Sequence, residues 1–308
     1  MEFLCTLLRL SPDRLKEVLF WYLKRKGMSP VNEDGYIYAE GDIPILLVAH
    51  MDTVFDEPPK FLSYFAENDM LYNPLGGLGG DDRCGVYAIL KLLEKYKPHI
   101  LFTEDEEIGA IGARKAAKNL PKPDVKYMIE FDRSGSNDCV FYTCGNQNFK
   151  DYVETFGFKT AIGSFTDIKV LGEAWDIAAV NLSSGYYNEH TENEYVVFSE
   201  LQKTIDRADR MIRDLKNVLP FDYQTKRYTY SYHTGYNNFN NDYYNFEAEL
   251  QAYLDDLNDR FDDYSTPTLV FGETKISLPK PEPRPRSKRL SDLIKKLTDD
   301  LNNNRKGL

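Results

Sequence analysis

The chain has 308 residues, 42% of them hydrophobic, so it is long enough to bury a sizeable core. Its formal net charge of -11 argues against a nucleic-acid-binding surface, which needs stripes of basic residues. No apolar run approaches the ~20 residues that span a bilayer, and we expect no secretory signal. The four cysteines form no CxxC pair, which suits reduced thiols. We therefore expect a cytoplasmic protein that binds neither nucleic acid nor membrane.

In chain order, a capped helix comes first and two strands follow it. Ser11 can cap this helix, Pro12 fits its first turn, and Gly27 can end it. Residues 36–50 predict a hairpin, in which a strand, a Gly-Asp turn and an apolar strand ending at His50 follow one another.

Strands and helices then alternate as far as residue 219. Strands are predicted over residues 99–107, 125–133, 138–144 and 176–183, and helices over residues 82–96, 109–120 and 198–219. This alternation is typical of the α/β class and predicts a domain over residues 1–220. We expect a three-layer α/β/α sandwich with a central mixed β-sheet.

The composition changes after Pro220. Residues 221–308 form a predicted extension that is first rich in Tyr and Asn and then acidic, with a possible helix over residues 246–264. A Pro-rich linker is predicted at about residues 277–289, and a short amphipathic helix follows it. This extension could cover a site as a lid, or it could bind another protein or a second copy of the chain.

Acidic residues or histidines follow five successive apolar segments of the predicted domain. They are His50 and Asp52, Asp81 and Asp82, residues 104–107, Glu130 and Asp132, and His190. Carboxylates that converge at one sheet edge repel each other strongly unless cations are present. A mixed set of histidine and carboxylate ligands suits Zn²⁺, or a similar divalent ion, better than Ca²⁺ or Mg²⁺.

There are enough candidate ligands for two ions. One carboxylate can bridge a metal pair, which activates a water molecule and polarises a carbonyl group. A further carboxylate is then needed as general base. Asp52 lies on the same side of the chain as His50, because extended side chains repeat every two residues. It can therefore either orient the histidine ring or act at the metal.

Taken together, these motifs resemble the zinc-dependent exopeptidases and deacylases with two co-catalytic metals. That group includes bacterial leucyl aminopeptidase, peptidase T and acetylornithine deacetylase. The matching segments are HMD at 50–52, GGDDRCG at 79–85, DEEIG at 105–109, EFD at 130–132 and NEHTENE at 188–194. They occur in the family's order and cover about two thirds of the chain.

The resemblance implies a role for each residue of the predicted site. The implied metal ligands are His50 and Asp132 at one ion, Glu107 and His190 at the other, and Asp81 as the bridge between them. Glu106 is the implied general base on the bridging water, and Asp52 orients His50. The ions are expected to be Zn²⁺, with Co²⁺ or Mn²⁺ as alternatives. Glu130 is a weaker candidate for the place of Asp132.

The implied reaction is hydrolysis of an amide bond, by an aminopeptidase that releases N-terminal residues from peptides. Deacylase-type relatives carry a separate lid or dimerisation domain before the last histidine, but here Asp132 and His190 are only 58 residues apart. This interval leaves no room for such a domain and favours the aminopeptidase architecture. A deacylase or amidase acting on N-acylated amino acids or small amides stays open. So does a non-catalytic metal-binding protein, although the intact Glu106 argues against it.

The remaining candidates concern substrate and structure. Asp167 lies where relatives place polar residues that contact substrate, and Arg83, beside the aspartate pair, is a second candidate contact. The resemblance also implies a cis peptide bond between Asp81 and Asp82, and it puts Glu194 where aspartate is commoner. We interpret the other notable side chains as structural: His99, His233 and Cys84.

Overall fold

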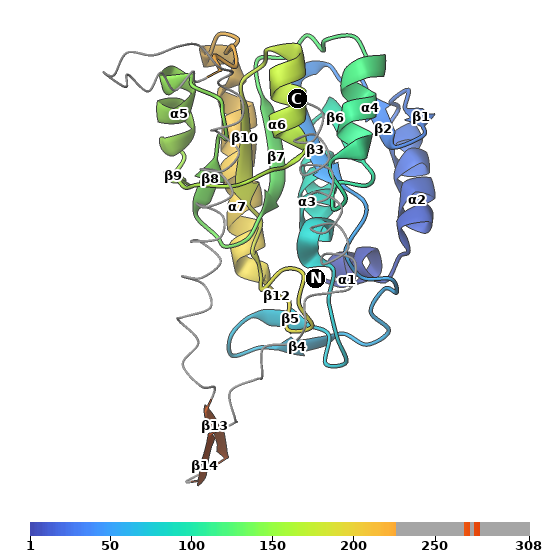
Figure 1. The fold of residues 1–308 in the computed structure, drawn as a ribbon, viewed down its shortest axis with the longest axis vertical. Helices are drawn as coiled ribbons and strands as arrows, with labels where there is room; N and C mark the ends of the chain where they lie inside the picture. The colour runs from blue at the N-terminus through green and yellow to red at the C-terminus, as the bar shows by residue number, and fades with distance from the viewer. Residues whose placement is uncertain (226–267, 272–273, 278–308) are drawn as a thin grey trace, which may run out of the picture. The chain divides into compact units, whose positions relative to one another are not determined.

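The structure is a computed structural model that describes residues 1–225, 268–271 and 274–277 (Figure 1). The chain divides into two units, residues 1–239 and residues 240–308. The described part of the second unit is an antiparallel hairpin of β13 (Thr268–Phe271) and β14 (Thr274–Ser277).

A mixed eight-stranded sheet runs through the first unit. Its strands are β1 (Val31–Glu33), β2 (Tyr36–Ala39), β3 (Ile43–His50), β6 (Pro98–Thr103), β7 (Met128–Arg133), β8 (Asp138–Val140), β9 (Lys159–Thr160) and β10 (Ala179–Ser183). The strand order is β1-β2-β6-β3-β7-β10-β8-β9. The four central strands, β6, β3, β7 and β10, are parallel to one another. They are mostly buried on both faces, as parallel strands covered by helices usually are.

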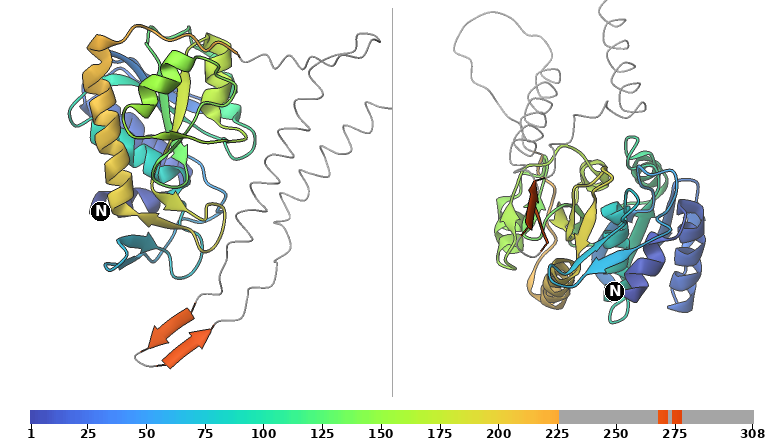
Figure 2. Two further views of the ribbon diagram at one scale, coloured as in Figure 1. Left: turned by 90° about the vertical axis from the view of Figure 1, so that its left-hand side faces the viewer. Right: turned by 90° about the horizontal axis from the view of Figure 1, so that it is seen from below.

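Helices cover both faces of this sheet, which gives the predicted three-layer α/β/α sandwich (Figures 1 and 2). The helices are α1 (Glu2–Leu8), α2 (Pro12–Arg25), α3 (Gly80–Leu92), α4 (Ile111–Asn119), α5 (Gln147–Glu154), α6 (Asp167–Trp175) and α7 (Phe198–Asp214). On one face α3 packs against β3 and β7 and contacts α1 and α7. On the other face α4 packs against α6, which contacts β7 and β10.

The predicted helices are present, and the first one is capped as expected. The Ser11 hydroxyl accepts a hydrogen bond from the Arg14 backbone N–H at 3.4 Å, and Gly27 follows the helix with a left-handed φ of 72°. This conformation is readily available to glycine and ends many helices. The helices α1, α5 and α6 were not predicted, and the strand expected over residues 138–144 spans only 138–140.

The predicted hairpin over residues 36–50 is wrong. Its two strands exist, but β6 lies between them: β2 pairs with β6 antiparallel, and β3 pairs with β6 in parallel. The Gly-Asp segment instead crosses the start of β6, where the Asp42 N–H donates to the Lys97 carbonyl at 2.8 Å. The hairpin that forms joins β1 to β2. A two-residue turn signal cannot exclude a third strand that arrives from far along the chain.

A second, four-stranded sheet was also not predicted. Its strands are β4 (Ser63–Phe65), β5 (Met70–Tyr72), β11 (Tyr186–Tyr187) and β12 (Tyr195–Val197), in the order β11-β12-β5-β4. The pairing of β12 with β5 brings the segment around residue 190 beside the segment that precedes α3. This small sheet thus joins two motifs that are more than 100 residues apart.

The proposed domain boundary at residue 220 stays a prediction, and the described chain continues to pack on the sandwich as far as residue 225. The Phe221 N–H donates to the Lys126 carbonyl at 2.8 Å, and Tyr223 is buried beside Gly172. The predicted acidic helix, C-terminal helix and nearly all of the Pro-rich linker lie outside the described residues. Among the described residues, no helix is long and apolar enough to cross a membrane.

Gly41 provides a test of the crossing between β2 and β3. A Cβ atom at this position would overlap the Lys97 carbonyl and the Pro98 backbone, which cannot move without disturbing the start of β6. We expect Gly41→Ala to lower the free energy of unfolding by about 1–3 kcal/mol, measured by denaturant titration. The exposed neighbour Glu40 provides the control, and Glu40→Ala should change the free energy of unfolding little. Equal stability of both variants would contradict the close approach.

Candidate metal centre

The candidate site lies at the carboxyl ends of the parallel central strands. His50 is the last residue of β3, Asp132 lies near the end of β7, and the acids of residues 104–107 follow β6. Asp81 comes from the start of α3, and His190 from the connection between β11 and β12. Open α/β sheets build their sites at this edge because the loops that follow parallel strands meet there.

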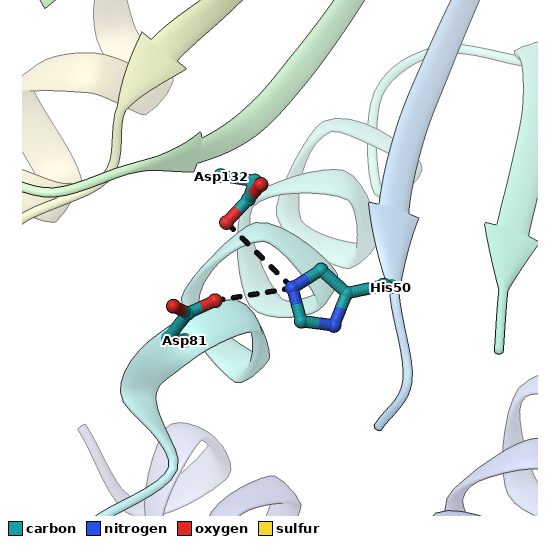
Figure 3. A group of neighbouring side chains, drawn as sticks. All are labelled: His50, Asp81 and Asp132. Carbon is teal, nitrogen blue, oxygen red and sulfur yellow. Dashed lines mark hydrogen bonds and ion pairs between the residues drawn. The ribbon is translucent and has the colours of Figure 1, made fainter. Parts of the chain in front are cut away.

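The first ligand group consists of His50, Asp81 and Asp132 (Figure 3). The His50 Nε2 atom lies 3.0 Å from Asp81 Oδ1 and 3.6 Å from Asp132 Oδ1. The His50 side chain is 1% exposed, so this group is enclosed. Three ligand atoms of this kind face a common point, as a metal ion requires.

The second ligand group consists of Asp81, Glu107 and His190. The His190 Nε2 atom lies 3.1 Å from Asp81 Oδ2 and 2.9 Å from Glu107 Oε2. Asp81 therefore offers one oxygen to each group. The side chain of His190 is 49% exposed, so the second group opens to solvent while the first is closed.

Asp52 contacts one residue of each ligand group, His50 in the first and Glu107 in the second. Its Oδ1 atom lies 3.4 Å from His50 Nδ1, and its Oδ2 atom accepts a hydrogen bond from the Glu107 N–H at 3.2 Å. Histidines that bind metals usually contact a carboxylate through the other ring nitrogen, which fixes the tautomer and the ring orientation. The position of Asp52 fits that need.

The charges around Asp81 favour a cation. Burial raises the pKa of Asp132 and of Glu107, and the nearby Asp81 carboxylate raises both further. Burial alone would lower the pKa of His190, but hydrogen bonds that its ring donates to Asp81 and Glu107 raise the pKa to about 12. Burial would also lower the pKa of His50, but hydrogen bonds to the carboxylates, that of Asp132 first, raise it well above its ordinary value. The clustered carboxylates thus favour positive charge beside them, and the donor set of histidines and carboxylates fits Zn²⁺.

Glu106 lies beside these groups without belonging to either of them. Burial raises its pKa well above the ordinary value, and the carboxylates of Asp132, Asp167 and Glu107 raise it further, while His50 opposes the rise. A carboxylate with a raised pKa is a better proton acceptor than an ordinary surface glutamate. A raised pKa of this kind is common among the acid–base groups of enzyme sites.

Asp82 holds the backbone next to the ligands. This fully buried carboxylate accepts hydrogen bonds from the Gly85 N–H at 2.9 Å and from the His50 N–H at 3.3 Å. Gly85 is required here because a Cβ atom would overlap the Asp82 carboxylate. The peptide bond between Asp81 and Asp82 is cis, as the family resemblance implied.

Asp132 is held by residues that the sequence analysis did not identify. Asn181 accepts from the Asp132 N–H at 2.8 Å and donates to its carbonyl at 2.6 Å. The Tyr186 hydroxyl donates to Asp132 Oδ1 at 3.0 Å, and the Thr166 hydroxyl lies 2.9 Å from Oδ2. A signal for Asn181 was available, since an asparagine inside an apolar strand needs partners.

The two candidate substrate contacts are buried. Both terminal nitrogens of the Arg83 guanidinium donate to backbone carbonyls, those of Met51 and Leu10, which is a structural arrangement. Asp167 is 0% exposed and accepts a hydrogen bond from the Thr103 hydroxyl. Burial raises its pKa to about 7. In this conformation neither side chain reaches the open side of the site.

The other candidates also lie outside the two ligand groups. The buried Glu130 carboxylate accepts hydrogen bonds from the Thr166 hydroxyl at 2.5 Å and from the Ile168 N–H at 3.4 Å. His99, near the start of β6, contacts the Tyr38 hydroxyl at 2.9 Å, and Cys84 is buried in the core. His233 lies outside the described residues.

A histidine–carboxylate cluster at the parallel edge of an α/β/α sandwich defines a class of metal-dependent hydrolases. The comparison with protein families agrees with this class. The model of peptidase family M28 matches residues 37–254, which is more than half of the chain. The chain therefore belongs to peptidase family M28, and it is a zinc-dependent metallopeptidase. This membership sets aside the non-catalytic interpretation.

Solved structures share the fold at low sequence identity. The aminopeptidase PepT from Bacillus cereus is 15% identical, with a TM-score of 0.57, over 70% of this chain and 97% of that one. A tripeptidase from Staphylococcus aureus is 14% identical, with a TM-score of 0.58, over the same shares. The peptidase PhTET1-12s, a dodecamer in its crystal, is 14% identical with a TM-score of 0.52, over 68% and 98%. A search of curated proteins found no match to the sequence.

Proposed function

We propose that this metallopeptidase is an aminopeptidase that holds two divalent ions, one in each ligand group, with Asp81 as the bridge. The observation that carries the proposal is the position of Asp81, whose two oxygens face His50 and His190 separately. His50 and Asp132 would complete the first site, and Glu107 and His190 the second. Zn²⁺ suits these donors best, with Co²⁺ and Mn²⁺ as alternatives.

The residues around the ions would do the remaining work. When bound, a pair of divalent ions polarises the scissile carbonyl and makes water more acidic. Glu106 would accept the proton of the attacking water and pass it to the leaving amine, which its raised pKa favours. Asp52 would keep the His50 ring and the Glu107 backbone in place. Substrate would approach from the side of the half-exposed His190.

The favoured substrate is a peptide with a free N-terminus. Two of the similar structures are described as an aminopeptidase and a tripeptidase, which favours a substrate with a free amine. The second candidate is an N-acylated amino acid or a small amide, which lacks that free amine.

The substrate class is tested by paired assays on the full chain. Aminoacyl-anilides and the same compounds with an acetylated amine would be compared at equal concentration in the presence of Zn²⁺. We expect hydrolysis of the free-amine substrates to be faster by at least about tenfold, because only they carry the ammonium group. Faster hydrolysis of N-acylated amino acids would replace the aminopeptidase by the deacylase.

The roles of Glu106 and Asp81 predict different outcomes for their variants. Glu106→Gln should retain the metal content of the wild type and lose activity by about 10²- to 10⁴-fold, because only the proton acceptor is removed. Asp81→Ala should lose both activity and bound metal, because its carboxylate belongs to both ligand groups. Elemental analysis of the purified proteins separates the two cases. Full activity of Glu106→Gln would refute its role as base.

Self-association is a further part of the proposal. The PhTET1-12s peptidase is a dodecamer in its crystal, and this chain exposes the aromatic residues Phe61, Tyr64 and Phe65 at and beside the edge strand β4. Exposed aromatic side chains are common at protein interfaces. Light scattering of the full chain is expected to give a multiple of the mass of one chain. The mass of a single chain at all concentrations would exclude an oligomer.

A further inference from the structure

Glu194 binds the backbone of the turn that carries Asp81. Its carboxylate accepts three backbone N–H groups, from Leu78 at 3.2 Å, from Gly79 at 2.6 Å and from Asp81 itself at 2.9 Å. Glu194 is 1% exposed, so these hydrogen bonds are shielded from water. Buried N–H groups at the start of a helix need acceptors, and here one side chain supplies all three.

The glycines of the turn make this approach possible. Gly79 has a left-handed φ of 75°, which directs the chain into α3. A Cβ atom on Gly80 would lie 3.1 Å from Glu194 Oε1 and 2.9 Å from a methyl group of Val196. The glycine-rich sequence before the aspartate pair therefore leaves room for a carboxylate that comes from another part of the chain.

The same glutamate belongs to the segment that carries His190. The Glu194 N–H donates to the Thr191 carbonyl at 3.3 Å, and the Thr191 hydroxyl donates to the Asn188 carbonyl at 2.7 Å. The segment is thus a compact turn, and β12 follows it directly. Glu194 therefore connects the backbone of Asp81, which faces both ligand groups, to the turn of His190, which belongs to the second.

We propose that Glu194 is a positioning residue of the metal centre, which fixes Asp81 relative to His190 by binding the backbone of the glycine-rich turn. The inference rests on the proposed function, because it concerns the residues assigned there as ligands. It adds a residue that touches no ligand atom in either group. A carboxylate suits this role because both of its oxygens only accept hydrogen bonds, and all three partners are donors.

The test replaces Glu194 by glutamine, which keeps the shape of the side chain. The amide of glutamine has one oxygen, which accepts, and one NH₂ group, which donates. The NH₂ group would therefore face at least one backbone N–H that needs an acceptor. We expect Glu194→Gln to weaken Zn²⁺ affinity by about 10- to 100-fold, as loss of a residue that supports metal ligands usually does. Affinity is measured on the chelator-treated full chain, by Zn²⁺ titration in competition with a chromophoric chelator.

Two further variants separate positioning from general stability. Glu192→Gln removes the same charge from an exposed position in the same turn and should leave Zn²⁺ affinity unchanged. Glu194→Asp keeps an acceptor-only head group and should recover part of the affinity that Glu194→Gln loses. The melting temperature of each metal-free variant is measured as well. Unchanged affinity in Glu194→Gln, or an equal loss in Glu192→Gln, overturns the proposal.

Two further outcomes remain decisive: a Glu194→Gln variant that does not fold, and wild-type protein that binds one ion instead of two. If Glu194→Gln yields no folded protein, Glu194→Asp decides: weaker affinity at an unchanged metal-free melting temperature supports the proposal, and unchanged affinity overturns it. Wild-type protein that binds a single Zn²⁺ would contradict the two-ion part of the proposed function. The affinity for that single ion would still test Glu194, because Asp81 belongs to both ligand groups.

Discussion

Asp81 lies within about one hydrogen-bond length of two histidines that come from distant parts of the chain, 3.0 Å from His50 and 3.1 Å from His190. The nearby carboxylates of Glu107 and Asp132 would repel it in this buried place without positive charge. The two histidines can offset that repulsion when they are protonated, and a bound metal cation can take the place of those protons. Several neighbouring groups hold these residues in place by hydrogen bonds to their backbones.

The candidate ligands are held in part through their backbones. Asp82 accepts the His50 N–H, Asn181 binds both the N–H and the carbonyl of Asp132, and Asp52 accepts the Glu107 N–H. Hydrogen bonds of this kind fix where a side chain begins without using its own oxygens, although the Asp132 oxygens also accept from the Tyr186 and Thr166 hydroxyls. Such support keeps a site close to its working geometry before a ligand arrives.

Much of the fold and of the site follows from local sequence. The apolar strand that ends at His50, the helix capped by Ser11 and the alternation of strands and helices predicted the α/β/α sandwich. The resemblance carried by the five motifs implied the class of enzyme and the candidate ligands. The hairpin over residues 36–50 was wrong because local turn signals do not reveal that β6 enters between two successive strands. The small sheet was missed because its strands have two or three residues each.

The sequence by itself determined the chemistry, since histidine and carboxylate side chains at strand ends attract a divalent cation wherever those ends meet. Only the tertiary structure decided which of the many acids share a site. Glu130 and Asp132 are two residues apart on β7, yet only Asp132 faces His50, while Glu130 contacts the Thr166 hydroxyl. The contacts of Glu194 with the turn before α3 also needed the fold, because the pairing of β12 with β5 creates them. Such contacts cannot be read from positions along the chain, because they form only when distant segments pack together.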